Sequence, residues 1–537
     1  MTPIRRPIVS SVAMAVLLMI GFGTRLSSLS AEERERPFEI RIVDQATGRG
    51  IPLVHLETVH QVGYVTDSAG RICFDEPQFD GDEIWFKVRA HGYEVPVDGF
   101  GLEGFRCRVR AGERHEVALV RKQLAERLYR VTGADRYRDS IRLGYPTPLD
   151  RTAGEGTERS GNVAGQDSVQ GVVYRDEIRW FWGDTNRLAY PLGLFHTAGA
   201  TSRLPDRGGL DPTVGIALDY RTDETGFARA MIDLEAPAQV LWLDGLAVVR
   251  DDRDQERMVA HYSRRKSLVD EVEHGVLLWD DATESFRKLA ARELADTWRV
   301  PFGHPEPTVV DGIAYLQFGN PYATCRVPAR LEALAAVDAY ESWTCLAADA
   351  GDSPESRVPL RRADGALDWA WRKAPPVSPV DELRWLESEA IAPDETWYLP
   401  EDAAKPGRRV RLHSGTVRWN AYRERWVMIA TEATDDPESP SWLGEVWYAE
   451  GPSPQGPFRK ALKVLGHDKQ TFYNPCHHPF LDGDGGRLIR FEGTYTNTFT
   501  SSPPTPRYDY NQIMYQLDLG DPRLIAVFGE PDRRKTP

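Results

Sequence analysis

Three acidic residues stand where acid–base chemistry would be expected, each beside a predicted strand. Asp167 follows a run of small residues, Asp184 directly follows the strand that ends in Trp-Phe-Trp-Gly, and Glu306 precedes the strand 308–318. A carboxyl group in such a place can donate or accept a proton, or tune the pKa of another carboxyl. An Asp between a strand and a Thr-Asn pair is also a common turn former, so a structural role for Asp184 stays open.

Five runs of alternating apolar and polar residues predict the strands that would position these groups. Each run comes with an aromatic cluster and a turn rich in Gly, Pro or Asp; the runs are Gly171–Asp184, Leu246–Tyr262, Pro307–Phe318, Thr416–Thr431 and Leu488–Thr496. Repetition at this scale is typical of a β-propeller, which gathers side chains from every blade at one axial end. We therefore predict an all-β chain with a five-bladed β-propeller over residues 145–525.

A smaller unit is predicted before the propeller, over residues 37–121, as a small β-sandwich of short strands. Its turn sequences, which lie at 43–52, 66–70 and 90–93, resemble the carboxypeptidase regulatory-like (transthyretin-like) domain. That resemblance implies an accessory module without catalysis. Leu124, Leu128 and Val131 fall at helical spacing, so residues 122–144 are predicted to form a linker helix.

The N-terminus has the features of an export signal. Arg5 and Arg6 precede an apolar stretch, Ile8–Phe22, that is followed by small polar residues. We expect residues 1–30 to be a signal peptide or a membrane anchor, and the protein to be exported to the periplasm, the cell surface or the medium. The net charge of −15 and the lack of a long Lys/Arg run argue against a nucleic-acid partner.

The five cysteines, Cys73, Cys107, Cys325, Cys345 and Cys476, suggest two disulfides with Cys476 left over, in a pairing that sequence does not fix. No Cys or His spacing predicts zinc. The segment Asp482–Gly486 resembles half of a calcium loop but lacks the closing Glu, and we interpret it as a turn. We expect no cofactor and no metal site, with a structural or axial calcium ion as the open alternative.

A resemblance to five-bladed propeller glycoside hydrolases of the arabinanase and furanosidase group rests on three segments. These are the opening run 160–186 with Trp-Phe-Trp-Gly-Asp-Thr, the run 414–426, and the turn sequence 449–458. The resemblance implies that Asp167 is the base or nucleophile, with Glu306 or Asp184 as the acid, and spacing does not decide between these two. The family's Asp in blade two has no clear match, since Asp251, Asp252 and Asp254 form a polar turn.

The same resemblance implies a set of side chains that bind sugar by hydrogen bonds or stacking. They are Trp182, Asn186, Arg187, Arg418, Trp419, His477 and His478. Adjacent histidines in a strand point to opposite faces, so only one of His477 and His478 can face the axis.

The function predicted from the sequence is that of an exported glycan-active protein, a glycoside hydrolase acting on a polysaccharide or oligosaccharide by a two-carboxylate mechanism. The alternative is a non-catalytic propeller that binds glycan or a protein partner at the cell surface. Convergence of Asp167, Asp184 and Glu306 in one site favours the hydrolase, and their dispersal to turns favours binding.

Overall fold

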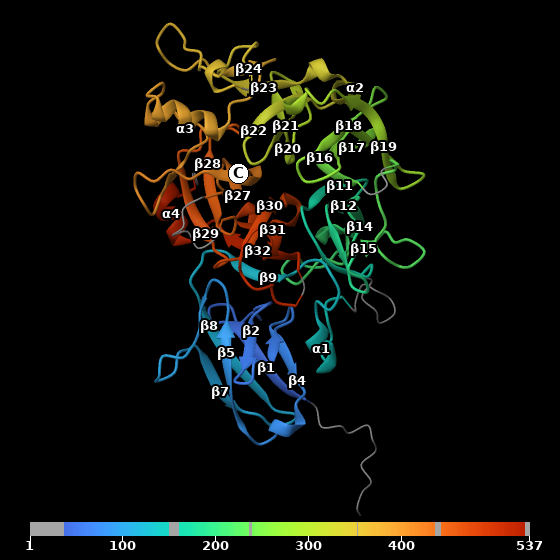
Figure 1. Ribbon diagram of the computed structural model, residues 1–537, viewed down its shortest axis with the longest axis vertical. Coiled ribbons are helices and arrows are strands. Elements are labelled where there is room, and N and C mark those ends of the chain that lie inside the picture. The colour runs from blue at the N-terminus through green and yellow to red at the C-terminus, as the bar shows by residue number, and fades with distance from the viewer. Residues whose placement is uncertain are drawn as a thin grey trace, which may run out of the picture. The chain divides into compact units, whose positions relative to one another are not determined.

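A computed structural model describes residues 37–149, 160–235, 239–351, 353–434, 442–507 and 509–531 (Figure 1). The predicted export signal lies outside these residues. The described chain is built almost wholly of β-strands. Its α-helices are short: α1 (Arg138–Arg142), α2 (Leu331–Ala335), α3 (Pro379–Glu387) and α4 (Pro522–Phe528). None of the helices in the described ranges is long and apolar enough to cross a membrane.

Two four-stranded sheets form the N-terminal part, in the orders β4-β1-β8-β6 and β3-β2-β5-β7. Their strands are β1 (Phe38–Asp44), β2 (His55–Thr58), β3 (Gly63–Val65), β4 (Arg71–Phe74), β5 (Glu83–Arg89), β6 (Tyr93–Glu94), β7 (Gly104–Arg108) and β8 (Arg114–Arg121). Alternate residues of these strands point inward, as the period of two requires, and form one apolar core that includes Ile40, Leu56, Phe86 and Leu119.

Five antiparallel sheets follow one another along the rest of the chain, and we number them first to fifth. The first holds β11 (Gln170–Tyr174), β12 (Glu177–Trp182), β14 (Ala198–Arg203) and β15 (Asp219–Tyr220). The second holds β16 (Val240–Arg250), β17 (Glu256–Arg265), β18 (Glu271–Asp280) and β19 (Ser285–Arg292). A separate short ribbon pairs β10 (Val163–Gln166) with β13 (Thr185–Arg187).

The third sheet holds β20 (His304–Val310), β21 (Ile313–Gly319), β22 (Ala323–Pro328), β23 (Glu341–Thr344) and β24 (Ala370–Arg372). The fourth holds β26 (Leu412–Asn420), β27 (Arg425–Glu432), β28 (Val446–Gly451), β29 (Lys460–Leu465) and the short parallel strand β25 (Glu401–Asp402). The segment 329–411 extends two of the sheets through β23, β24 and β25.

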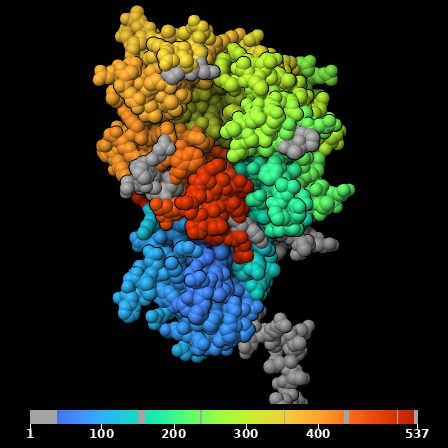
Figure 2. All heavy atoms as spheres, viewed as in Figure 1, coloured from blue at the N-terminus to red at the C-terminus, as the bar shows by residue number. Residues whose placement is uncertain are grey.

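The fifth sheet joins both ends of the chain. Its strands are β30 (Thr471–His477), β31 (Leu488–Thr496), β32 (Asn511–Asp518) and β9 (Glu126–Arg130), and β9 lies at the edge beside β32 (Figure 1). The first strands of neighbouring sheets contact one another, β11 with β16, β16 with β20, β20 with β26, and β26 with β30. In the space-filling view the red fifth sheet borders both the orange fourth sheet and the blue-green first sheet (Figure 2).

The predicted linker helix is wrong over most of its length. Leu128 and its neighbours in β9 are fully buried on both faces of a strand, and only Arg138–Arg142 is helical. The open edge of β32 supplies backbone hydrogen-bond partners, and this tertiary pairing outweighs the weak helical spacing of three residues. Arg127 then ties β9 to the N-terminal sheets, because its guanidinium donates to the carbonyl oxygens of Pro52 and His91.

The two predicted disulfides are also wrong. All five cysteines are free and buried. Cys73 and Cys107 lie on β4 and β7, which belong to different sheets, and Cys107 packs in the apolar core.

Candidate active site

Asp167 and Asp184 are held together by the backbone. The ribbon of β10 and β13 ends at this point, where the Asp184 amide donates a 2.7 Å hydrogen bond to Asp167 Oδ1 and the Asp167 amide donates to the Asp184 carbonyl at 3.1 Å. Gly183 makes this approach possible, because a Cβ atom there would lie 2.5 Å from Asp167 Oδ1. The two acidic residues that sequence placed in one blade are therefore neighbours in space.

The pair also shows the electrostatics of an acid–base site. Desolvation, with the charge of Asp184 as the second cause, raises the pKa of Asp167 to about 7, although hydrogen bonds from Tyr473 and the Asp184 amide oppose the shift. Desolvation likewise raises the pKa of Asp184, against a hydrogen bond from Trp242. Two carboxyls this close resist a double negative charge, so the pair keeps one proton up to near-neutral pH.

Side chains from two other sheets hold the pair in place. The Tyr473 hydroxyl, on the fifth sheet, donates a 2.7 Å hydrogen bond to Asp167 Oδ2. The Trp242 indole, on the second sheet, donates a 3.1 Å hydrogen bond to Asp184 Oδ1. Both residues keep part of their surface exposed, and each oxygen of the Asp167 carboxyl accepts a hydrogen bond from the protein.

Next to this pair along the first strands lies a layer of polar side chains that joins four sheets. Gln170 Nε2 donates to Asp244 Oδ1 at 3.5 Å, and the Gly303 amide donates to the same oxygen at 3.2 Å. His304 Nδ1 lies 3.6 Å from Cys476 Sγ, which links the third sheet to the fifth. Desolvation raises the pKa of Asp244 to about 6.

Glu306 belongs to a different cluster. Arg418 donates to Glu306 Oε2 at 3.0 Å and to the Pro305 carbonyl at 2.7 Å, and the Trp419 amide donates to Glu306 Oε1 at 3.2 Å. Both carboxylate oxygens of Glu306 are thus occupied by donors of the fourth sheet. The predicted binding residues Arg418 and Trp419 therefore meet the predicted acid Glu306, but none of these contacts involves the Asp167–Asp184 pair.

The direction of the first strands places the two clusters on opposite sides of the polar layer. Trp242, near Asp184, precedes Asp244 on β16, just as Asp167 precedes Gln170, so both strands run from the carboxyl pair to the layer. On β20 the layer is at Gly303 and His304, and Glu306 comes after it. The three residues from Gly303 to Glu306 span about 10 Å of extended chain.

The first strands of the fourth and fifth sheets run in the same direction, from the side of the carboxyl pair toward the polar layer. Tyr473 contacts Asp167 at the start of β30, while Asn420, at the far end of β26, donates a 2.7 Å hydrogen bond to the Gly486 carbonyl in the turn beyond β30. Arg418 lies two residues before Asn420 and reaches Glu306. Glu306 therefore comes after the layer along its strand, and its side chain bonds to Arg418 and to the Trp419 amide. Of the three expected carboxyl residues, Asp167 and Asp184 are the two that the structure joins by a hydrogen bond.

Within the layer, a buried chain of titratable groups runs from Cys476 to Glu492. His478 Nδ1 lies 3.8 Å from Cys476 Sγ, and His478 Nε2 lies 3.0 Å from Glu492 Oε1. His304 and His478 lower the pKa of the Cys476 thiol despite its burial. Burial opposes the charge on His478, but Cys476 and Glu492 outweigh it and raise the pKa of His478 to about 10.

Both predicted axial histidines are buried and contact a carboxylate of the protein through Nε2, while His477 Nδ1 is buried without a hydrogen-bond partner. His477 Nε2 lies 3.0 Å from each carboxylate oxygen of Asp482, and the residue is buried. His478 is enclosed by Cys476, Glu492 and the ring of Trp180. Neither imidazole reaches the exposed part of the site.

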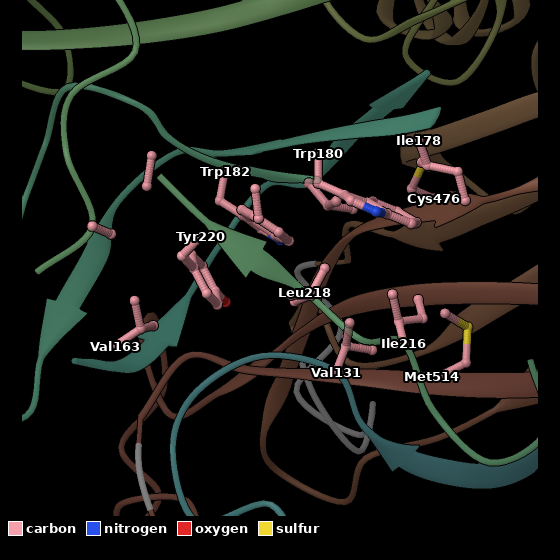
Figure 3. Packing of buried hydrophobic residues seen from close by; sticks show 14 of the residues in the cluster. Val131, Val163, Ile178, Trp180, Trp182, Ile216, Leu218, Tyr220, Cys476 and Met514 are labelled. Carbon is pink, nitrogen blue, oxygen red and sulfur yellow. The ribbon is translucent and has the colours of Figure 1, made fainter. Parts of the chain in front are cut away.

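Trp182 cannot stack on a sugar in this structure because it is a core residue. Only 1% of its surface is exposed, and it packs between Trp180 and Tyr220 (Figure 3). Its neighbours Asn186 and Arg187 lie on β13 and are partly exposed, and the Arg187 guanidinium covers the ring of Phe227 at 4.0 Å. The three predicted binding residues of this blade therefore point to different surroundings.

Sequence reasoning missed Tyr473, Trp242 and Asp244. Asp244 lies in the run Leu-Trp-Leu-Asp-Gly that opens β16, whereas Asp251, the expected substitute, accepts backbone hydrogen bonds from Arg253 and Gln255 in a turn. The signal available in the sequence was an Asp inside the apolar run that opens β16. Nothing local marks Tyr473 or Trp242, whose roles depend on contacts with another sheet.

The described residues contain no group of three or more His, Cys, Asp or Glu side chains arranged to hold a metal ion. The expectation of no cofactor, with calcium as the alternative, stays a prediction.

No family model matches the chain, and the comparison with curated proteins gives no match. Solved structures that are similar to it include a Bacteroides ovatus protein, with a TM-score of 0.39, 12% identity, and coverage of 66% of this chain and 86% of that one. A GH43_1 enzyme from Xanthomonas citri gives a TM-score of 0.32 and 13% identity over 69% of this chain and 92% of that one. An exo-1,5-α-L-arabinanase from a bovine ruminal metagenomic library gives a TM-score of 0.32 and 7% identity, with coverage of 66% of this chain and 93% of that one.

Proposed function

We propose that the protein is a glycoside hydrolase whose catalytic carboxyls are Asp167 and Asp184. The observation that carries the proposal is their pairing: the Asp184 amide donates a hydrogen bond to the Asp167 carboxyl, both residues are partly exposed, and desolvation raises the pKa of each. Glycoside cleavage needs one carboxyl group that protonates the leaving oxygen and one carboxylate that activates water or attacks carbon.

In this proposal Asp167 is the general acid and Asp184 is the base or nucleophile. Asp167 is the more deeply desolvated of the two, and its pKa of about 7 lets it hold the transferable proton at the pH where Asp184 is ionised. This reverses the roles implied by the family resemblance. The reason is physical: of two coupled carboxyls, the proton stays on the one that loses more solvation when charged.

We propose further that the five sheets form the blades of a propeller. Support comes from the order of the sheets along the chain, from the contacts between their first strands, and from β9, which adds the N-terminal segment to the last sheet. Such closure joins the first and last blades. The side chains that hold Asp167 and Asp184 come from the second and fifth sheets, which is the convergence that this architecture provides.

The proposal is tested by reducing-sugar release over a panel of arabinan, xylan, pectin and fructan. We expect the wild-type protein to release sugar from one polymer, and Asp184→Asn and Asp167→Asn each to lower kcat by at least a hundredfold while the fold is kept. Arg203→Gln, a change at the exposed end of β14 in the first sheet, serves as the surface control. No release by the folded wild-type protein would favour a non-catalytic glycan- or protein-binding function.

A further inference from the structure

The loop between β31 and β32 carries an exposed aromatic side chain in an uncommon backbone conformation. Phe499 is 55% exposed and has a φ of +67°, a left-handed value that non-glycine residues adopt with strain. Exposure of a large apolar side chain to water is unfavourable, so contact of the Phe499 ring with a ligand would be favourable.

Phe499 is one member of an aromatic row that leads from the surface to the carboxyl pair. Trp442, 41% exposed, packs edge-on against Phe499 with ring centroids 5.8 Å apart, and Phe499 packs edge-on against Tyr473 at 6.0 Å. The Tyr473 hydroxyl then donates to Asp167. An uninterrupted series of contacts therefore joins two exposed rings to a catalytic carboxyl of the proposed function.

Hydrogen bonds hold the loop that presents Phe499. The Thr471 hydroxyl donates to the Thr498 carbonyl at 3.0 Å, the Ser502 hydroxyl donates to the Lys469 carbonyl at 2.7 Å, and the Gln470 side chain donates to the Pro503 carbonyl at 2.9 Å. These bonds fasten the loop to the chain just before β30 and to the start of that strand. The loop that carries the Phe499 ring is thus held in place before a ligand binds, which lowers the entropy cost of binding.

The carboxyl groups beside this row are Asp167, Asp184 and Asp509, of which Asp184 is the ionised member of the catalytic pair in the proposed function. After desolvation, the charges of Asp167 and Asp184 help to raise the pKa of both Tyr473 and Tyr510. Asp509, which accepts a hydrogen bond from Thr496, also raises the pKa of Tyr510. A ligand that carries carboxylates would meet repulsion here, whereas the apolar face of an uncharged sugar ring would meet a fixed aromatic surface.

We propose that Trp442 and Phe499 form a stacking subsite for an uncharged sugar unit of the substrate, next to Asp167. This inference rests on the proposed function, in which the ligand is the substrate of a glycoside hydrolase. It names the substrate class as a neutral polysaccharide such as arabinan, xylan or galactan, and not a polyuronate. Trp442 and Phe499 are binding residues in this assignment, and Tyr473 is a positioning residue that acts through Asp167.

Affinity electrophoresis tests the proposal without requiring turnover. The probes are debranched arabinan, arabinoxylan and galactan, with polygalacturonate as the charged comparison. We expect wild-type protein to be retarded by at least one neutral polymer and not by polygalacturonate. Trp442→Ala and Phe499→Ala should each weaken that retention about tenfold, and Phe499→Tyr, which keeps the ring, should retain it. Phe100→Ala, at an 86% exposed ring in the N-terminal sheets, is the matched control and should bind as wild type.

Three results would overturn the subsite: retention by none of the neutral polymers, retention that both alanine variants keep within twofold, or stronger retention by polygalacturonate. Asp184→Asn separates this inference from the proposed function. If it binds a neutral polymer through Trp442 and Phe499 while the wild-type protein releases no sugar from that polymer, the subsite stands and the hydrolase fails. If sugar is released but the aromatic variants leave KM unchanged, the subsite fails and the hydrolase stands.

Discussion

The hydroxyl of Tyr473 donates a 2.7 Å hydrogen bond to Asp167 Oδ2 across 306 residues of sequence, and so links the fifth sheet to the start of the first. This bond stabilises the charged form of a carboxyl that desolvation and Asp184 push toward its neutral form. Asp167 is therefore held between opposing influences, and a change at Tyr473 alters its protonation without touching the carboxyl itself.

Tyr473→Phe removes this donor and keeps the ring. Because the hydrogen bond lowers the pKa of Asp167, its loss should raise that pKa further, by about one unit for a hydrogen bond to a charged group. The basic limb of the kcat/KM profile should move to higher pH by the same amount. Tyr64→Phe, which removes a hydroxyl bonded to Glu76 in the N-terminal sheets, should leave the limb in place, and an unchanged limb in Tyr473→Phe would count against Asp167 as the acid.

Asp167→Asn should make the protein more stable at alkaline pH. The pKa of Asp167 is raised in the folded state, so the stability it contributes is fully present below about pH 4 and is lost as pH rises through about 7. Asn carries no charge, so its contribution to stability does not change between pH 4 and pH 8. Melting temperatures should therefore be similar for both proteins at pH 4 and higher for the variant at pH 8. The free energy of unfolding of the variant at pH 8 should exceed that of the wild type by ~2–4 kcal/mol. A variant that is equally destabilised at both values would show that the desolvation is not large.

Glu306→Gln should separate the two carboxylate clusters. Its side chain pairs with Arg418 on the far side of the polar layer, so we expect activity within about threefold of wild type and a lower melting temperature, since the Arg418 charge loses its partly buried partner. Asp184→Asn should show the opposite pattern, with lost activity and a retained fold. A hundredfold loss of kcat in Glu306→Gln would return Glu306 to the catalytic role that the resemblance implies.

Thiol titration in denaturant without reductant should give five thiols per chain, because all five cysteines are free. In the native protein we expect slow reaction at every one of them, since all are buried. A count of one or three would show that disulfides form in the exported protein.

Two truncations should isolate the contribution of β9. A chain that starts at residue 122 keeps β9 beside β32, whereas a chain that starts at residue 131 leaves the β32 edge unpaired. Both lose the N-terminal sheets, so their difference reports the strand alone. We expect the shorter chain to aggregate or to melt several degrees lower, because an unpaired edge strand exposes backbone donors and acceptors. Equal melting temperatures would show that β9 contributes no stability to the fifth sheet.

Local sequence pattern was enough to predict the strands and to single out the two acidic residues of the candidate site. The alternating runs fall on strands of the five sheets, and the Trp-Phe-Trp-Gly-Asp-Thr segment marks Asp184, because alternation and turn chemistry act over a few residues. Asp167 could be singled out for the same reason. Side-chain environment could not be read this way, and Trp182, expected at a binding surface, is a core residue.

What only the tertiary structure decided is which of these residues meet. β9 became a strand because β32, far away in the chain, offers an unpaired edge; Glu306 left the site because β20 carries it past the polar layer; and Tyr473 and Trp242 entered it from other sheets. The pKa of Asp167 likewise depends on solvent excluded by distant segments. The sequence by itself determined an all-β chain with paired acidic residues at a strand end, since periodicity and turns are local. Which side chains contact the Asp167–Asp184 pair and tune its pKa values required the fold, since contact across sheets is a property of three-dimensional packing.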